Sequence, residues 1–217
     1  MLSIKKILIL GMLIAAGILA AGCTQQAPAV SCDDETGVCM VPSVPVQPAA
    51  TSPTPVPTIV PLEAWERAVL ETDMGTITIA LDPAMPVTAG NFKRLVANGY
   101  YDGVIFHRVA SGFMIQGGDP TGTGRGGPGY TIPDEFARSN RNDRGTVAMA
   151  NSGPNTGGSQ FFINLVNNNY LDKKHPVFGR VVEGMAVVDA IAKVETTGEA
   201  GNYRPLQNVT IIRAVMI

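Results

Sequence analysis

The sequence predicts a mainly-β domain, namely a closed antiparallel barrel with two helices. The domain occupies the last roughly 150 residues of the chain, a common size for one domain. Short apolar runs recur there between stretches dense in Gly, Pro, Asn and Asp, a pattern typical of many short strands. Two other segments carry apolar residues at helical spacing. A barrel is expected because closure removes the exposed edges that the strands would otherwise leave.

The domain is expected to begin with a β-hairpin. Residues 68–72 and 75–81 form its predicted strands, the second of which alternates polar and apolar residues, with a turn at residues 73–75. Residues 88–98 then carry apolar side chains at helical spacing and are followed by Gly99, which favours the end of a helix. The sequence therefore predicts a hairpin followed by the first of two helices.

Further strands and a second helix are predicted in the rest of the domain. The strands are the short apolar runs at residues 104–109, 112–116, 146–150, 160–166, 177–182 and 209–215. Residues 185–194 carry the second helical pattern. Strands therefore make up most of the expected domain.

The chain begins with the layout of a secretory signal peptide over residues 1–22, in which a lysine pair precedes an apolar run at residues 7–21. That run is short for a bilayer-spanning helix, which needs about 20 apolar residues. Residues 20–23 are similar to the lipobox of secreted lipoproteins, so Cys23 is expected to carry a diacylglyceryl group. The alternatives are an uncleaved anchor and a plainly secreted protein. Each of them places the rest of the chain outside the cytoplasm, at the cell surface or the periplasmic face of the membrane.

Residues 23–64 form a Pro-rich segment that favours extended polyproline geometry and is expected to act as a tether. In an oxidising compartment, Cys32 and Cys39 would most simply close a small disulfide loop, with free thiols as the alternative. A closed zinc site needs four ligands, usually thiolate or imidazole groups, so a metal suits this pair less well. The domain at residues 65–217 contains no cysteine, so its fold depends on no disulfide.

The charge pattern gives no reason to expect a nucleic-acid partner. Lysine plus arginine balance aspartate plus glutamate in the domain, and no basic stripe occurs. His107 and His175 are the only histidines, and two imidazoles without neighbouring cysteines make a weak case for a metal. The G-x-G-x-x-G pattern at residues 122–127 is followed by Pro128 rather than by a helix, so it is interpreted as a surface loop. Neither a metal nor a cofactor is expected.

Three ordered sequence blocks carry the functional signal. The first runs through residues 106–109 and 112–119, the second through residues 149–162 and the third through residues 171–179. These blocks resemble the signatures of the cyclophilins, which are peptidyl-prolyl cis-trans isomerases, and the resemblance covers essentially all of residues 65–217. It implies a mainly-β fold, a closed eight-stranded antiparallel β-barrel of cyclophilin type with two flanking helices, in a short prokaryotic-like form.

Rotation about an X-Pro peptide bond needs neither a nucleophile nor a metal. The barrier is about 18–20 kcal/mol because nitrogen conjugation gives the C–N bond partial double-bond character. A catalyst needs a donor that stabilises the pyramidal prolyl nitrogen and a pocket that holds the ring during rotation. Arg108 suits the donor role because its guanidinium is permanently charged and has several N–H groups.

The resemblance implies roles for the other residues of these blocks. Phe113 and His175 are implied to act with Arg108 and Gln116 as the catalytic set, in which Gln116 helps to hold the guanidinium and the substrate carbonyl. His107 is implied to be structural. The remaining implied residues contact the substrate, some at the proline ring and some along the peptide groove: Met114, Ala150, Asn151, Gln160, Phe162, Tyr170 and Leu171.

One position departs from the pattern of many eukaryotic cyclophilins. Tyr170 stands where those proteins carry a Trp that contributes to binding the drug cyclosporin. We therefore expect weaker cyclosporin binding than in Trp-bearing relatives, with catalysis little affected.

The sequence thus predicts an exported, lipid-anchored and monomeric isomerase that assists the folding of extracytoplasmic proteins. Its expected partners are proline-containing polypeptides and, through Cys23, the membrane. Two alternatives stay open at this point. One is a binding module that holds proline-containing segments with little turnover, and the other is self-association through the Pro-rich tether.

Overall fold

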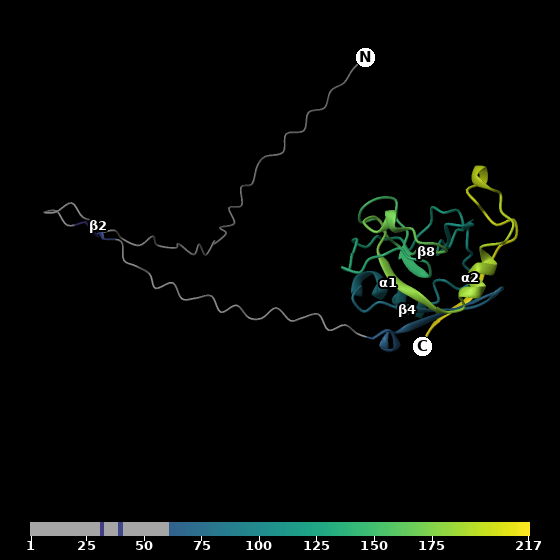
Figure 1. The fold of residues 1–217 in the computed structure, drawn as a ribbon, viewed down its shortest axis with the longest axis horizontal. Coiled ribbons are helices and arrows are strands. Elements are labelled where there is room, and N and C mark those ends of the chain that lie inside the picture. The colour runs from purple at the N-terminus through teal and green to yellow at the C-terminus, as the bar shows by residue number, and fades with distance from the viewer. Residues whose placement is uncertain (1–30, 33–38, 41–60) are drawn as a thin grey trace, which may run out of the picture. The chain divides into compact units, whose positions relative to one another are not determined.

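The computed structural model describes Ser31–Cys32, Cys39–Met40 and residues 61–217, which fall into two units (Figure 1). The predicted signal peptide, the predicted lipidation site Cys23 and most of the Pro-rich tether lie outside the described residues. Within the described part of the chain, no helix is both long and apolar enough to cross a bilayer.

The C-terminal unit is mainly β, as predicted. Its strands are β3 Arg67–Thr72, β4 Gly75–Leu81, β5 Arg108–Ala110, β6 Met114–Gly117, β7 Thr146–Met149, β8 Phe161–Asn164, β9 Val177–Glu183 and β10 Ile211–Met216. Its α-helices are α1 Pro86–Ala97 and α2 Met185–Ile191. Three short 3-10 helices complete it: η1 Leu62–Ala64, η2 Asn169–Leu171 and η3 Glu199–Gly201.

The eight strands form one antiparallel sheet in the order β10-β3-β4-β9-β7-β8-β6-β5. The two outer strands β10 and β5 share no ladder, but the segments before them meet at an isolated antiparallel bridge between Ile105 and Thr210. Flanking backbone hydrogen bonds join Phe106 N–H to the Val209 carbonyl at 2.9 Å and Ile211 N–H to the Val104 carbonyl at 2.8 Å. The predicted eight-stranded antiparallel barrel is therefore confirmed as a sheet that curls until its ends meet at this bridge.

The predicted hairpin at the start of the domain is confirmed as β3 and β4. The Thr72 hydroxyl donates to the Gly75 carbonyl at 2.6 Å and accepts from the Met74 N–H at 3.2 Å, which closes the turn. Gly75 has a φ of 129°, and a Cβ there would lie 2.8 Å from a Val187 methyl group. Glycine is therefore required at this position for both its backbone conformation and the close approach of α2.

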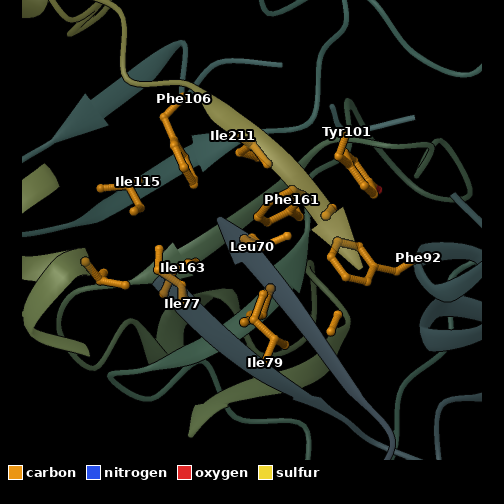
Figure 2. Close-up of a cluster of buried hydrophobic side chains, with 14 of the residues drawn as sticks. Leu70, Ile77, Ile79, Phe92, Tyr101, Phe106, Ile115, Phe161, Ile163 and Ile211 are labelled. Atoms are coloured by element: carbon orange, nitrogen blue, oxygen red, sulfur yellow. The ribbon is translucent and has the colours of Figure 1, made fainter. Parts of the chain in front are cut away.

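The main core lies inside the curled sheet and is dominated by aromatic and β-branched side chains. Figure 2 shows Phe92 from α1 among Leu70, Tyr101 and Phe161 in this cluster. The Phe92 ring lies 5.1 Å from that of Tyr101 and 5.3 Å from that of Phe161, centroid to centroid. Helix α1 contacts β10 and β9, whereas α2 contacts β4. The two helices thus bury their apolar faces against different strands of one sheet.

Some predicted element bounds differ from those of the structure. The predicted strand at 104–109 contains ladder pairs only from Arg108 onward, since its first half makes isolated bridges instead. The predicted strand at 112–116 begins at Met114, because Gly112 has a φ of 72° and a turn joins Ala110 to Phe113. The second helix ends at Ile191 rather than at residue 194.

The N-terminal unit contains one described element, a two-stranded antiparallel pair of β1 Ser31–Cys32 and β2 Cys39–Met40. Its register places Cys32 opposite Cys39 in the backbone pairing. The disulfide between these two cysteines stays a prediction.

Candidate active site

A single pocket of about 330 Å3 brings together most of the predicted site residues. They reach it from β5, β6, β8, η2 and the segments that precede β6, follow β7 and precede β9. The predicted residues that line it are Arg108, Phe113, Met114, Gln116, Ala150, Asn151, Phe162, Leu171 and His175. Two predicted residues, Gln160 and Tyr170, lie outside its lining.

Strand alternation explains why these side chains face the pocket rather than the main core. Successive residues of a strand point to opposite faces of a sheet. On β6, Ile115 belongs to the main core, whereas Met114 joins a smaller buried cluster. On β8, Phe161 and Phe162 divide between the two clusters in the same way. The smaller cluster, which also contains Leu171, therefore supplies an apolar wall to the pocket.

Phe113 is fixed through its backbone and makes two ring contacts. Its carbonyl oxygen accepts hydrogen bonds from the Leu165 N–H and from the Asn168 side-chain amide, both at 3.0 Å. The guanidinium carbon of Arg108 lies 5.8 Å from the centroid of the Phe113 ring. The ring of Tyr170 stacks on Phe113 at 6.3 Å with an interplanar angle of 18°. Tyr170 is 65% exposed, so it lies at the outer edge of this aromatic contact.

Arg108 is a half-buried cation beside an apolar wall. Its contact with the Phe113 ring has the geometry of a cation–π interaction. Its Nε atom is buried and has no hydrogen-bond partner among the described residues. Arg108 stands opposite Gln116 in the register of β5 and β6. The Gln116 Nε2 atom donates to Gln160 Oε1 at 2.9 Å, and the contact of Gln116 with the guanidinium stays a prediction.

His175 is held as a neutral imidazole at the side of the pocket. Its Nδ1 atom lies 3.1 Å from the Met149 carbonyl oxygen, which only accepts, so Nδ1 is the protonated nitrogen. Burial lowers the pKa of His175, although the hydrogen bond to Met149 acts in the opposite direction. The ring meets Phe162 edge-on at 5.3 Å, with an interplanar angle of 82°. His175 therefore contributes an apolar surface and one free ring nitrogen near neutral pH.

A second groove of about 600 Å3 continues from the pocket along residues 124–131. It shares Gln116, Gly124, Ala150 and Asn151 with the pocket and is also lined by Gln160. The predicted groove residues are thus found together, with Gln160 at the junction rather than in the pocket. This arrangement suits an extended peptide whose proline occupies the pocket.

Three pocket residues were not predicted to contact a ligand: His107, Gly124 and Asn202. Gly124 belongs to the glycine pattern that the sequence analysis interpreted as a surface loop. Asn202 follows η3 and has a left-handed backbone with a φ of 57°, and no motif in the sequence connects it with Arg108.

Within residues 61–217, no cluster of three or more His, Cys, Asp or Glu side chains is placed to hold a metal.

Comparisons with known proteins agree with this geometry. Residues 67–216 match the family described as "Cyclophilin type peptidyl-prolyl cis-trans isomerase/CLD". The chain is 47% identical over 152 residues to "Peptidyl-prolyl cis-trans isomerase-like 1" of Aspergillus oryzae, covering 68% of this chain and 92% of that protein. It is 44% identical over 162 residues to the Homo sapiens protein of the same name, covering 71% and 96% of the two chains.

A third relative is much longer than this chain. "Peptidyl-prolyl cis-trans isomerase CYP71" of Arabidopsis thaliana is 50% identical over 156 residues, which are 70% of this chain and 24% of that protein. These relatives are eukaryotic, so the prokaryotic-like form stays a prediction.

A solved structure shares the fold. The crystal structure of a Cryptosporidium parvum cyclophilin type peptidyl-prolyl cis-trans isomerase aligns with a TM-score of 0.67 and 33% sequence identity. The alignment covers 70% of this chain and 98% of that one. The pocket geometry, the family match and these relatives together show that the chain belongs to the cyclophilin-type peptidyl-prolyl cis-trans isomerase family.

Proposed function

We propose that this isomerase accelerates rotation about X-Pro bonds in extracytoplasmic proteins, with the proline ring in the pocket and Arg108 at the prolyl nitrogen. The observation that carries the proposal is the position of Arg108, a permanent cation beside an apolar wall. Conjugation of the prolyl nitrogen is lost as the bond rotates, so its lone pair becomes available to a donor. A donor that binds this lone pair stabilises the transition state more than the ground state.

The pocket supplies the two features that this reaction needs. Met114, Phe162 and Leu171 form a buried apolar surface on which a proline ring can be held. The guanidinium beside it is partly removed from water, where its interaction with a developing lone pair is stronger than in bulk solvent. No covalent step or cofactor is required, because the reaction only rotates a bond.

The cellular location follows from the N-terminal sequence and belongs to the same proposal. A signal peptide at residues 1–22 and a lipid on Cys23 would leave the domain outside the cytoplasm, on a tether of Pro-rich sequence. An extended Pro-rich chain advances about 3.1 Å per residue, so the domain would reach proteins well away from the membrane surface. Mass spectrometry of the mature N-terminus tests the lipid anchor, and an intact Met1 or an unmodified Cys23 would contradict that anchor.

The full chain should be assayed on a proline tetrapeptide whose trans form alone is cleaved by an added protease. The proposal predicts that catalytic amounts of the chain accelerate the slow phase, which takes tens to hundreds of seconds without a catalyst. Turnover no faster than the uncatalysed rate would contradict it. In that case, peptide binding measured by titration would leave the alternative, a proline-binding module with little turnover.

The oligomeric state forms a separate part of the proposal. We expect a monomer. Light scattering of the mature chain would reveal self-association through the tether as a mass above that of one chain.

A further inference from the structure

Asp119 lies two residues after the end of β6 and is fully buried beneath the glycine loop, defined here as residues 120–126. One carboxylate oxygen accepts from the Thr121 N–H at 2.7 Å and from the Thr121 hydroxyl at 2.8 Å. The other accepts from the N–H groups of Thr123, Gly124 and Gly126 at 3.0, 2.6 and 3.0 Å. A single buried carboxylate therefore organises the backbone of the whole loop.

The loop can close over this carboxylate only because it is rich in glycine. Gly122 and Gly124 have φ values of 64° and 82°, which side-chain-bearing residues rarely adopt. A Cβ on Gly126 would lie 2.0 Å from an Asp119 carboxylate oxygen. Burial alone would raise the pKa of Asp119, but the Thr121 hydroxyl and the loop N–H groups hold it well below its usual range. The carboxylate is therefore ionised at neutral pH and remains an acceptor.

With the N–H groups turned toward Asp119, two loop carbonyls are presented to Gln160. The Gln160 Nε2 atom donates to the Gly124 and Gly126 carbonyl oxygens at 3.1 and 2.9 Å. Carbonyl oxygens only accept, so the amide nitrogen of Gln160 must face the loop. The Gln160 Oε1 atom consequently faces Gln116 and accepts from its Nε2 atom at 2.9 Å. The orientation of one amide thus determines that of the next.

This chain of hydrogen bonds ends next to Arg108. The Nε2 atom of Gln116 is engaged by Gln160, which leaves the Gln116 Oε1 atom as the acceptor available to other donors. Arg108 stands opposite Gln116 in the sheet register, and its buried Nε has no partner among the described residues. A guanidinium can only donate, so an amide oxygen is the complementary neighbour and an amide nitrogen would repel it.

We propose that Asp119 is a positioning residue for catalysis, acting through the glycine loop, Gln160 and Gln116 to present the Gln116 carbonyl oxygen to the Arg108 guanidinium. The inference rests on the proposed role of Arg108 in the isomerase reaction. It explains why a buried carboxylate follows β6, close to a site that uses no acid or base. A merely structural Asp119 would support the loop without any effect that depends on Gln116.

The test is a double-mutant cycle between Asp119→Asn and Gln116→Ala in the full chain, measured by the protease-coupled assay. An asparagine at position 119 keeps the shape but directs an amide nitrogen at donor groups, so the loop should lose its orientation. We expect Asp119→Asn to lower kcat about tenfold with little change in KM. In the Gln116→Ala background the same change should have no further effect, because residues that act as one unit are not additive.

One further variant keeps the test informative if Asp119→Asn folds poorly. Gln160→Met breaks the chain of hydrogen bonds but leaves every contact of Asp119 in place. It should lower kcat to a similar extent and should also have no further effect beside Gln116→Ala. The matched control is Glu135→Gln, the same chemical change at a carboxylate that binds the backbone N–H groups of Val87 and Thr88 and does not line the pocket. It should leave kcat/KM unchanged.

The possible results distinguish a failure of the proposed function from a failure of the positioning role. An inactive wild-type chain would contradict the proposed function itself. An active wild-type chain in which the effects of Asp119→Asn or Gln160→Met multiply with that of Gln116→Ala would overturn the positioning role alone. An Asp119→Asn chain with a lower melting temperature but an unchanged kcat would overturn the positioning role as well.

Discussion

Arg108 differs from an ordinary strand arginine in what surrounds it. Exposed arginines are usually solvated or paired with a carboxylate, and no ion pair within residues 61–217 includes Arg108. Its guanidinium instead contacts the Phe113 ring beside an apolar wall. The N–H groups of a cation in this setting remain available to donate to a ligand, so we assign the central role to Arg108.

At the residue scale, we expect Tyr170 to control a second property, the affinity for cyclosporin. Its exposed ring stacks on Phe113, and a Trp there would offer a larger apolar surface and an indole N–H. We predict that Tyr170→Trp tightens cyclosporin binding about tenfold or less, corresponding to roughly 0.5–1.5 kcal/mol for an aromatic contact. Calorimetric titration of both chains measures this change. Equal affinities would show that the ring at this position does not control drug binding.

The sequence blocks were enough to predict which side chains meet, but not every bond between them. Alternation on β6 and β8 makes Met114 and Phe162 pocket residues, which a period of two predicts once the strands are known. The hydrogen bond from Gln116 to Gln160 depends on how the glycine loop folds around Asp119. Asn202 reaches the pocket from a loop far along the chain, so only the three-dimensional fold reveals it.

At the scale of elements, α1 is capped by a residue distant in the sequence. No side chain next to its start caps the helix, and Pro86 stands at its first position. The carboxylate of Glu135 instead accepts from the backbone N–H groups of Val87 and Thr88, at 3.0 and 2.9 Å. This contact joins the loop after the groove to the helix that supplies Phe92 to the core.

Replacing Glu135 should therefore lower the stability of the fold without changing kcat/KM. Removal of the negative charge from a helix N-terminus costs about 0.3–1 kcal/mol. We predict that Glu135→Gln lowers the melting temperature by about 1–4 °C in a domain of this size. Differential scanning calorimetry measures the shift. An unchanged melting temperature would mean that the contact contributes nothing to the stability of α1.

Element existence was easier to predict than element bounds, for a physical reason. Each of the eight strands corresponds to an apolar run, because burial on at least one face demands apolar residues. The bounds depend on which residues pair with a neighbouring strand. The segment before Arg108 is apolar, yet it makes only isolated bridges where the two ends of the sheet meet. The cap of α1 by Glu135 has no local signal at all, since the two residues that it joins lie far apart in the chain.

At the scale of the whole molecule, both histidines of the chain lie in and around the pocket and have lowered pKa values. Burial is the main cause at His107 and at His175. At His107 the charge of Asp119 acts in the opposite direction, whereas Arg204 and Arg108 lower the pKa further. The unfolded chain binds these protons near the ordinary histidine pKa of about 6.5, whereas the folded chain does not. The two neutral histidines therefore cost the folded state nothing above about pH 6.5, and the free energy of unfolding decreases as the pH falls below that value.

We predict a lower free energy of unfolding at about pH 5.5 than at about pH 7.5, measured by urea denaturation. His175→Gln removes one of the two titrating groups and should reduce this difference. The carboxylate of Asp119, whose pKa is lowered, begins to matter only below the ordinary value of about 3.8–3.9, outside this window. A stability that is constant or higher at the lower pH would contradict the prediction.

The central claim is that one cation beside an apolar wall accelerates rotation about the X-Pro bond, and kcat/KM of Arg108→Ala tests it most directly. Loss of a preorganised donor to a transition state costs about 10²–10³ in rate, so we predict a decrease of that order with an unchanged melting temperature. Arg108→Lys, which keeps the charge but loses the planar fork, should recover only part of the loss. A folded Arg108→Ala chain that retains wild-type kcat/KM would contradict the account.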